Sequence, residues 1–589
     1  AEAWLLGALW RMTRVIRPKK RTKASAGSKI CLVWRNYIQT VSFGLLIYAL
    51  CQYVNADRNY YHYTNTRWML IFLAAAFLMN YNQRLFLNWV SAAWFGLSVV
   101  GSVLYCNGFR ADEKELVLAR LTCGVVIAWG LLVICIIRSV VRAEKIRFWD
   151  FIQRFHEDIP YMTHLALWVL FALLMFMYRF EKVWVITATL PFAAYFFSKG
   201  TPPAKARFLR NFCNGILLSF VLVMVFCLHH RPHHYWMLYR YGGMFHTVAC
   251  TGMYLAVVFG AAVAKLYGKL KTRTNMVKIC YKEYFMTACV TGFILLTMSR
   301  TAFLTTIVTV LSVVALTAVT YRKKARRIVL ELGVLAVVCL GSFPMVFTAV
   351  RMVPAVINDP VRYEIEFQDK SFMIYEGDPI DSDKYMTVRR FFATLFGRFQ
   401  TDNAQAQTDL TLQETGVFAY TGDDLAGLDM RAAGGGDSGA GGEHAEEKKD
   451  ISNGRFDIFR AYLEALGIHG HPKMGPENEN GEEYAHAHNS YLQVAYNFGM
   501  IAGVIFLVLC ATTLWRAVRL FMEYGKKYNI FLVPFAQVIV FGFVSLTEWA
   551  FHPCIPAGFS FLMMLVVLIH KDASENMSPG GEDSYYEFF

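Results

Sequence analysis

The chain has 589 residues, of which 56% are hydrophobic and only 17% are charged, against about 25% charged residues in an ordinary soluble domain. Its formal net charge is +14, but the basic residues stand in short clusters between apolar runs, as they do in the loops of membrane proteins. This pattern excludes a soluble globular protein and argues against nucleic acid as a partner. We therefore expect the lipid bilayer to surround most of the chain.

Apolar runs of membrane-spanning length recur along the sequence and predict the fold class. A spanning helix needs about 20 mostly apolar residues, and runs of this kind predict about fourteen spans here. We expect an all-α protein, a polytopic transmembrane helix bundle with one large extracytoplasmic loop domain. The expected spans are 37–54, 67–79, 85–105, 117–137, 163–178, 183–197, 209–228, 245–266, 283–298, 301–321, 328–350, 489–515, 530–549 and 555–569.

The basic clusters fall in alternate loops and predict the orientation. They lie at 17–21, 138–154, 199–210, 265–282, 322–327 and 516–527. The positive-inside rule places such loops in the cytoplasm, and both termini with them. The expected organisation is a basic N-terminal segment on the cytoplasmic leaflet (1–36), a transmembrane bundle (37–350), an extracytoplasmic loop domain (351–488), the last spans (489–570) and a cytoplasmic tail (571–589).

The loop domain has a middle part of unusual composition. Residues 401–449 are rich in Gly, Ala, Asp and Glu, which cannot bury a core, and we expect this insertion to be mobile. Its flanks at 387–399 and 452–466 have helical spacing. In the second flank Phe456, Phe459, Leu463 and Leu466 fall on one helical face.

Metal and redox chemistry have little support in the sequence. Most of the 13 cysteines lie inside apolar runs, and no CxxC pair occurs, so they are expected to be small buried hydrophobic residues. His486 and His488 form a possible pair of metal ligands, but no third ligand of suitable spacing follows. The histidines at 229–234 lie beside aromatic residues typical of a membrane interface. We expect no metal and no cofactor.

Three residues of the predicted outer face have chemical potential. Arg300 lies between two apolar runs, where a charge needs a partner or a role; the alternative is an arginine that reaches the interface from a helix end. Arg455 opens a predicted helix, whose first turn favours anions; the alternative is a solvated arginine. His488 precedes a predicted span and could act as a general base, or be a plain interfacial histidine.

Four segments together resemble the O-antigen ligase and O-antigen polymerase superfamily of membrane glycosyltransferases. The similarity extends from about residue 240 to residue 569. The matching segments are a glycine-containing turn at 240–245, the Ser-Arg-Thr-Ala element at 299–302, a Gly-Arg helix at 454–466 with its Pro-x-x-Gly turn at 472–475, and the His-Asn-x-x-Leu element that begins at His488.

The resemblance implies a GT-C-like fold and a site on the extracytoplasmic face of the bacterial cytoplasmic membrane. It implies an undecaprenyl-diphosphate-linked glycan donor and a glycan or lipid-linked acceptor. Arg300 and Arg455 would clamp the diphosphate, because guanidinium is a permanent forked donor for phosphate oxygens. His488 would deprotonate the acceptor hydroxyl, which attacks with inversion and without metal. Weaker candidates for substrate binding are Arg240, Asn489, Tyr491 and Arg460.

Three functions remain open on the sequence. A polymerase would add carrier-linked units to a growing glycan, and this is the reading we favour. A ligase would move the finished glycan to lipid A-core, or to a protein, by the same chemistry. A polysaccharide flippase or transporter should place charged or broken helices at the bilayer midplane in two related halves, and the sequence has no such repeat.

Overall fold

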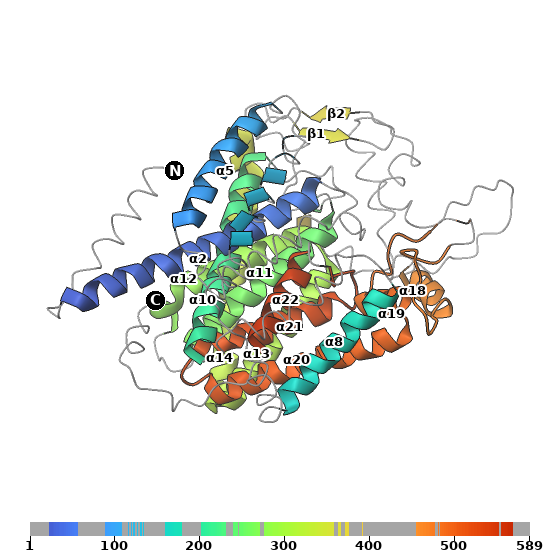
Figure 1. Cartoon of the computed structure of the whole chain (residues 1–589). Coiled ribbons are helices and arrows are strands. Elements are labelled where there is room, and N and C mark those ends of the chain that lie inside the picture. Colours follow the sequence, from blue (N-terminus) through green and yellow to red (C-terminus); the bar gives the residue numbers. More distant parts are fainter. Residues whose placement is uncertain are drawn as a thin grey trace.

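A computed structural model gives the structure of the chain. It describes residues 23–56, 89–108, ten residues between 116 and 134, 159–178, 202–230, 240–245, 247–270, 276–357, 363–366, 372–375, 391–392, 455–477, 481, 483–552 and 555–568. Helices dominate these residues, as predicted (Figure 1). The exception is an antiparallel hairpin of β1 (Tyr363–Glu366) and β2 (Phe372–Tyr375), in which Tyr363 pairs with Tyr375 and Glu366 with Phe372.

The described helices follow the predicted spans in order. They are α2 (Lys23–Ala56), α5 (Trp89–Asn107), α8 (Ile159–Tyr178), α10 (Pro202–His230), α11 (Val248–Lys269), α12 (Met276–Thr297), α13 (Arg300–Tyr321), α14 (Ala325–Ile357), α18 (Arg455–Glu464), α19 (Ser490–Phe498), α20 (Met500–Tyr524), α21 (Leu532–Val544, after the 3-10 turn η3, Asn529–Phe531) and α22 (Pro556–Leu568).

Seven helices in the described part of the chain are long and apolar enough to cross a membrane. They lie in α2, α5, α10, α11, α13, α14 and α20. The predicted spans 67–79 and 183–197 lie outside the described residues, as does the insertion 401–449. The expected total of about fourteen spans therefore stays a prediction.

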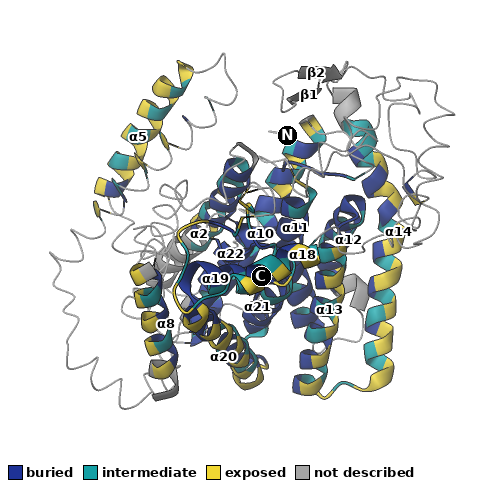
Figure 2. Ribbon diagram, turned by 90° about the vertical axis from the view of Figure 1, so that its right-hand side faces the viewer, coloured by how far each residue is buried: buried dark blue, intermediate teal, exposed yellow. Residues whose placement is uncertain are grey.

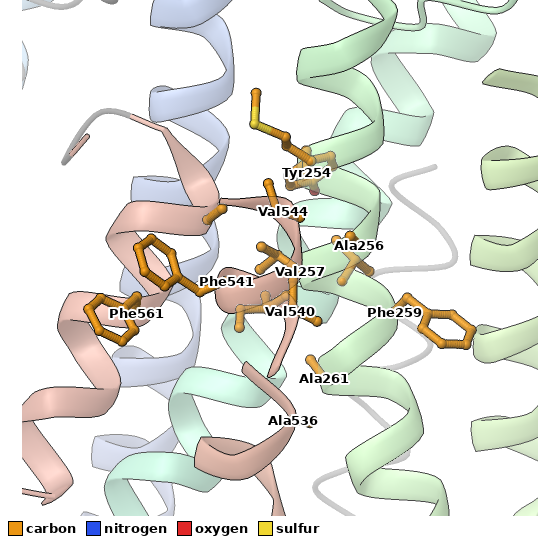
Figure 3. Close-up of a cluster of buried hydrophobic side chains, with 14 of the residues drawn as sticks. Tyr254, Ala256, Val257, Phe259, Ala261, Ala536, Val540, Phe541, Val544 and Phe561 are labelled. Atoms are coloured by element: carbon orange, nitrogen blue, oxygen red, sulfur yellow. The ribbon is translucent and has the colours of Figure 1, made fainter. Parts of the chain in front are cut away.

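Helix α11 forms the centre of the bundle and packs on α21 at close range. A Cβ added at Gly260 would lie 2.9 Å from a methyl group of Val540, so any larger residue would force that side chain to shift. Beside it the buried Gln537 donates to the Val257 carbonyl (2.9 Å) and accepts from Ser560 of α22 (2.9 Å). Figure 3 shows the apolar side chains of these helices around this contact. A buried amide with both ends bonded fixes how the three helices fit together.

The outer helices expose apolar side chains, as lipid-facing helices do. Figure 2 shows α11, α21 and α22 buried at the centre, and exposed faces on α8, α14 and α20 at the periphery. Val337 of α14 and Val504 of α20 are among the exposed residues. Apolar faces of this extent would be unfavourable in water and are expected in hydrocarbon.

Two predicted spans are wrong in detail. The run 489–515 is two helices, because Gly499 adopts φ +88°, which ends α19 and lets α20 begin at Met500. A side chain there would meet the Ile468 carbonyl oxygen. The run 530–549 ends as a helix at Val544, and residues 545–552 continue as a non-helical segment in which Leu546 is exposed and Glu548 to His552 are buried. The second break lies beside the candidate site described below.

Buried ion pairs gather where α13 ends and α14 begins. Lys323 (2.7 Å) and Arg327 (3.0 Å) both pair with the fully buried Glu331, and Arg327 also donates to the Leu270 carbonyl at 2.6 Å. Tyr321 reaches the Gly525 carbonyl at 3.1 Å. This end of the bundle, formed by residues 270, 321–331 and 525, is called the basic end. The other end of α13, about 33 Å away for a helix of this length, begins at Arg300.

Candidate active site

The non-helical segment 545–552 forms the floor of the site, and Ser490 holds it in place. The Ser490 amide donates to the Ser545 carbonyl (2.8 Å), and its hydroxyl donates to the Glu548 carbonyl (2.9 Å). The same hydroxyl accepts from the Ala550 amide at 2.7 Å. Buried polar groups of a non-helical backbone need such partners.

Glu548 is the centre of the site. Its side chain is 6% exposed. It accepts hydrogen bonds from Arg455 at 2.8 Å and from Nδ1 of His488 at 3.2 Å. Burial disfavours the charged carboxylate, but the hydrogen bond and charge of His488 and the charge of Arg455 outweigh it and hold the pKa of Glu548 well below its ordinary value. Glu548 is therefore an anion that can only accept hydrogen bonds.

His488 is oriented by this carboxylate. Because an ionised Glu548 only accepts, Nδ1 of His488 carries the proton of the hydrogen bond between them. The backbone of His488 is left-handed (φ +46°), which costs a non-glycine residue about 1–2 kcal/mol. Its amide donates to Nδ1 of His486 at 3.2 Å. Strained residues of this kind cluster at functional sites.

His486 stays neutral beside the charged groups. Its ring meets the His488 ring with centroids 4.1 Å apart. Burial, aided by the positive charges of His488 and Arg455, lowers the pKa of His486 to about 3, although Glu548 opposes the shift. A neutral His486 can accept a hydrogen bond from the His488 amide. This bond fixes the backbone of His488, whose ring faces Glu548.

Arg455 begins α18, as predicted, and joins the floor to the rest of the site. One Nη donates to the Thr547 carbonyl at 2.7 Å and the other to Glu548 at 2.8 Å. Its side chain is still 31% exposed, so the guanidinium has a face open to a ligand. The Thr547 hydroxyl is 2.9 Å from the hydroxyl of Thr301, in the first turn of α13.

Arg300 and Arg240 both lie at the turn between α12 and α13. Ser299 caps α13 by accepting from the Ala302 amide (3.4 Å), and the exposed Arg300 follows it. Arg240 donates to the Thr297 carbonyl at 3.3 Å, and the Tyr241 amide donates to the Leu296 carbonyl at 3.0 Å. Through Thr301 and Thr547, this turn is tied to Arg455 and Glu548. The end of the bundle that carries these residues is called the site end.

The other predicted site residues have structural partners. Asn489 caps α19 by accepting from the amides of Tyr491 (2.9 Å) and Leu492 (3.1 Å), and it donates to the Leu546 carbonyl. The Tyr491 hydroxyl donates to the Gly542 carbonyl at 3.2 Å. The exposed Arg460 pairs with Glu464 along α18 at 2.8 Å. Their expected contacts with substrate stay predictions.

The predicted apolar face of α18 does not turn into the protein. Ile458 and Tyr462 are the buried residues of this helix, whereas Phe456 and Leu463 are exposed. Tyr462 packs against Tyr496 of α19 with ring centroids 5.0 Å apart and donates to the Met474 carbonyl. The helix is thus attached by the side that carries Ile458 and Tyr462.

Sequence reasoning missed Glu548. The predicted span 530–549 placed this residue inside a helix, although a lone carboxylate in an apolar run is itself a signal of function. The residue falls three positions after Ser545, where the helix has already ended. Among the described residues no group of three or more His, Cys, Asp or Glu side chains could hold a metal ion.

The O-antigen ligase family profile matches residues 285–507. This stretch contains Arg300, Arg455 and His488, and it ends before Glu548. No curated protein and no solved structure matches the chain. The match confirms the resemblance stated from the four sequence segments. The chain is therefore a multi-pass membrane protein in which residues 285–507 are similar to the O-antigen ligase family.

Proposed function

We propose that this protein is a glycosyltransferase that moves a glycan from an undecaprenyl-diphosphate carrier to a sugar hydroxyl, on the outer face of a bacterial cytoplasmic membrane. The observation that carries the proposal is the group of Arg455, His488 and Glu548, tied to Arg300 through two threonine hydroxyls. A base and two phosphate-binding cations are what transfer from a lipid diphosphate requires. The family match supports the same reaction class.

His488 acts as the general base. Its Nδ1 proton is engaged by Glu548, so Nε2 is free to accept the proton of the acceptor hydroxyl. Glu548 fixes the ring and stabilises the imidazolium that forms, as a carboxylate behind a catalytic histidine does. The activated oxygen attacks the anomeric carbon opposite the diphosphate, and the product has inverted configuration.

Arg455 and Arg300 bind the diphosphate and stabilise its growing charge as it leaves. Arg455 uses donors on both terminal nitrogens for the protein and keeps an exposed side for the ligand. Arg300 stands at the start of α13, where the helix dipole also favours an anion. Two permanent cations neutralise the diphosphate, so the proposed reaction needs no metal.

The acceptor distinguishes two candidate functions. A polymerase, the reading favoured from the sequence, would use a carrier-linked glycan as acceptor. A ligase would use lipid A-core or a protein, and the description of the matching family favours this second candidate. Both functions use the same base and the same arginines.

The test is turnover of a synthetic undecaprenyl-diphosphate oligosaccharide by purified protein, with EDTA present and with or without lipid A-core. A ladder of longer carrier-linked glycans identifies a polymerase, and product only with lipid A-core identifies a ligase. Arg455→Lys should reduce turnover at least tenfold in either case, because lysine loses the fork. Arg519→Lys, an exposed arginine over Trp515 of α20, is the matched control. Normal turnover in Arg455→Lys would contradict the proposed clamp.

A further inference from the structure

Helix α18 presents three different sides to its surroundings. At about 100° per residue, Phe456, Phe459 and Leu463 fall within about 60° of one another. The side that carries Ile458 and Tyr462 is attached to α19 and to the loop before it. The third side is polar and carries Asp457, Arg460 and Glu464, with Arg460 and Glu464 80% and 65% exposed. The apolar side lies between the other two.

Two side chains of the apolar side are largely exposed. Phe456 is 70% exposed and Leu463 is 54% exposed, while the rings of Phe456 and Phe459 contact each other edge to face. A solvated helix gains nothing from large apolar groups on an open face. A helix with one apolar and one charged side is the form that lies in the plane of a bilayer surface, with its apolar side in the acyl chains.

This apolar side continues into the lipid-facing surface of a spanning helix. After α18 the chain passes through Ile468, which is 58% exposed, and the Gly467 carbonyl accepts from the Met500 amide at 3.0 Å. Met500 and Ile501 begin α20 and are 42% and 52% exposed. Figure 1 shows α18 beside α19 at this end of α20.

We propose that α18 is a membrane-surface helix whose side formed by Phe456, Phe459 and Leu463 binds the acyl chains of the adjacent bilayer leaflet. Arg460 and Glu464 then face the water. Arg455, in the first turn of the same helix, is held at the depth of the lipid headgroups, where a lipid diphosphate lies. The contact with lipid does not depend on glycosyl transfer and can be tested without turnover.

The test is photo-crosslinking of the full chain in phosphatidylglycerol–phosphatidylethanolamine nanodiscs. The photoreactive residue p-benzoylphenylalanine replaces Phe456 or Leu463, and in matched controls it replaces Arg460 or Glu464 on the polar side. Adducts are identified by mass spectrometry of the α18 peptide. We expect phospholipid adducts at positions 456 and 463 at least about fivefold more frequent than at 460 and 464.

Equal yields at the four positions, or no lipid adducts at 456 and 463, would overturn the proposal. Crosslinks from 456 and 463 mainly to protein would also overturn it, because another segment or partner would then cover this side. Two apolar positions are used so that poor folding of one variant does not decide the result. Loss of lipid adducts with normal glycan transfer would reject this inference and leave the proposed function intact.

Discussion

The two ends of the bundle each contain a buried carboxylate that binds two cationic side chains, and the difference between them separates structure from function. At the basic end Glu331 is fully buried, and its partners Lys323 and Arg327 are 2% and 31% exposed. At the site end Arg455 and His488 are 31% and 27% exposed around Glu548. At the basic end one of the two cations is sealed, whereas at the site end both partners of the carboxylate are partly exposed. A sealed ion pair can only join helices, whereas a partly exposed one can also bind a ligand or transfer a proton.

The largest expected effect comes from removing the proposed base at the site end. His488→Ala should lower turnover of the lipid-diphosphate glycan by about 10²–10⁴-fold, the usual contribution of a general base. His471→Ala is the control, since His471 stacks on Tyr496 and contacts the Ala465 carbonyl in the same segment. The control should lower stability without a comparable loss of turnover. Full activity in His488→Ala would remove the base assignment.

The same substitution at the two carboxylates compares the ends directly. Glu331→Gln leaves Lys323 buried without a counter-charge, and breaking such a pair costs about 3–5 kcal/mol of unfolding free energy. Glu548→Gln leaves Arg455 partly exposed, where water can solvate it, so stability should change less, while turnover falls because the His488 ring loses the carboxylate that orients it. Thermal unfolding in detergent and turnover at low temperature measure the two effects. If Glu548→Gln costs stability but leaves turnover normal, the site end is only structural.

Sequence reasoning found the cations of the site end but not what holds them. Arg300 and His488 were visible because a charged residue at the edge of an apolar run needs a reason. Glu548 and the break at Gly499 were missed because apolar periodicity continues through both helix ends, and neither a lone glycine nor a lone carboxylate changes that period. The bonds of Ser490 to the floor join residues about sixty positions apart, and no local pattern records such contacts.

Acid should destabilise the site end before it affects the basic end. The lowered pKa of His486 means that the unfolded chain binds a proton below pH 6.5 that the folded chain refuses until about pH 3, so stability falls by up to about 1.4 kcal/mol per pH unit in that window. The lowered pKa of Glu548 adds a further loss as pH falls below its ordinary 4.5. Above pH 6.5 both His486 and Glu548 make their full contribution to the free energy of unfolding.

The measurement is the thermal midpoint of unfolding between pH 7.5 and 5. In this range only His486 of the two groups contributes, so His486→Gln should flatten the decline while Gln still offers an acceptor to the His488 amide. Asn489→Ala, which removes no titratable group from the same site, is the control and should keep the slope of the wild type. An unchanged slope in His486→Gln would show that His486 is not held neutral.

The smallest expected effect concerns Asn489, which the sequence placed among the weaker substrate-binding residues. In the structure its side chain accepts from the first amides of α19 and donates to the Leu546 carbonyl on the floor. Loss of an N-cap costs about 0.5–2 kcal/mol, so Asn489→Ala should lower the thermal midpoint by a few degrees. Asn489→Asp keeps the cap acceptor but not the amide donor, and should recover most of that loss. If Asn489 only positions His488, both variants should change turnover less than Glu548→Gln does. A turnover loss in both variants as large as that of His488→Ala, with stability kept in Asn489→Asp, would instead place the Asn489 amide in contact with substrate.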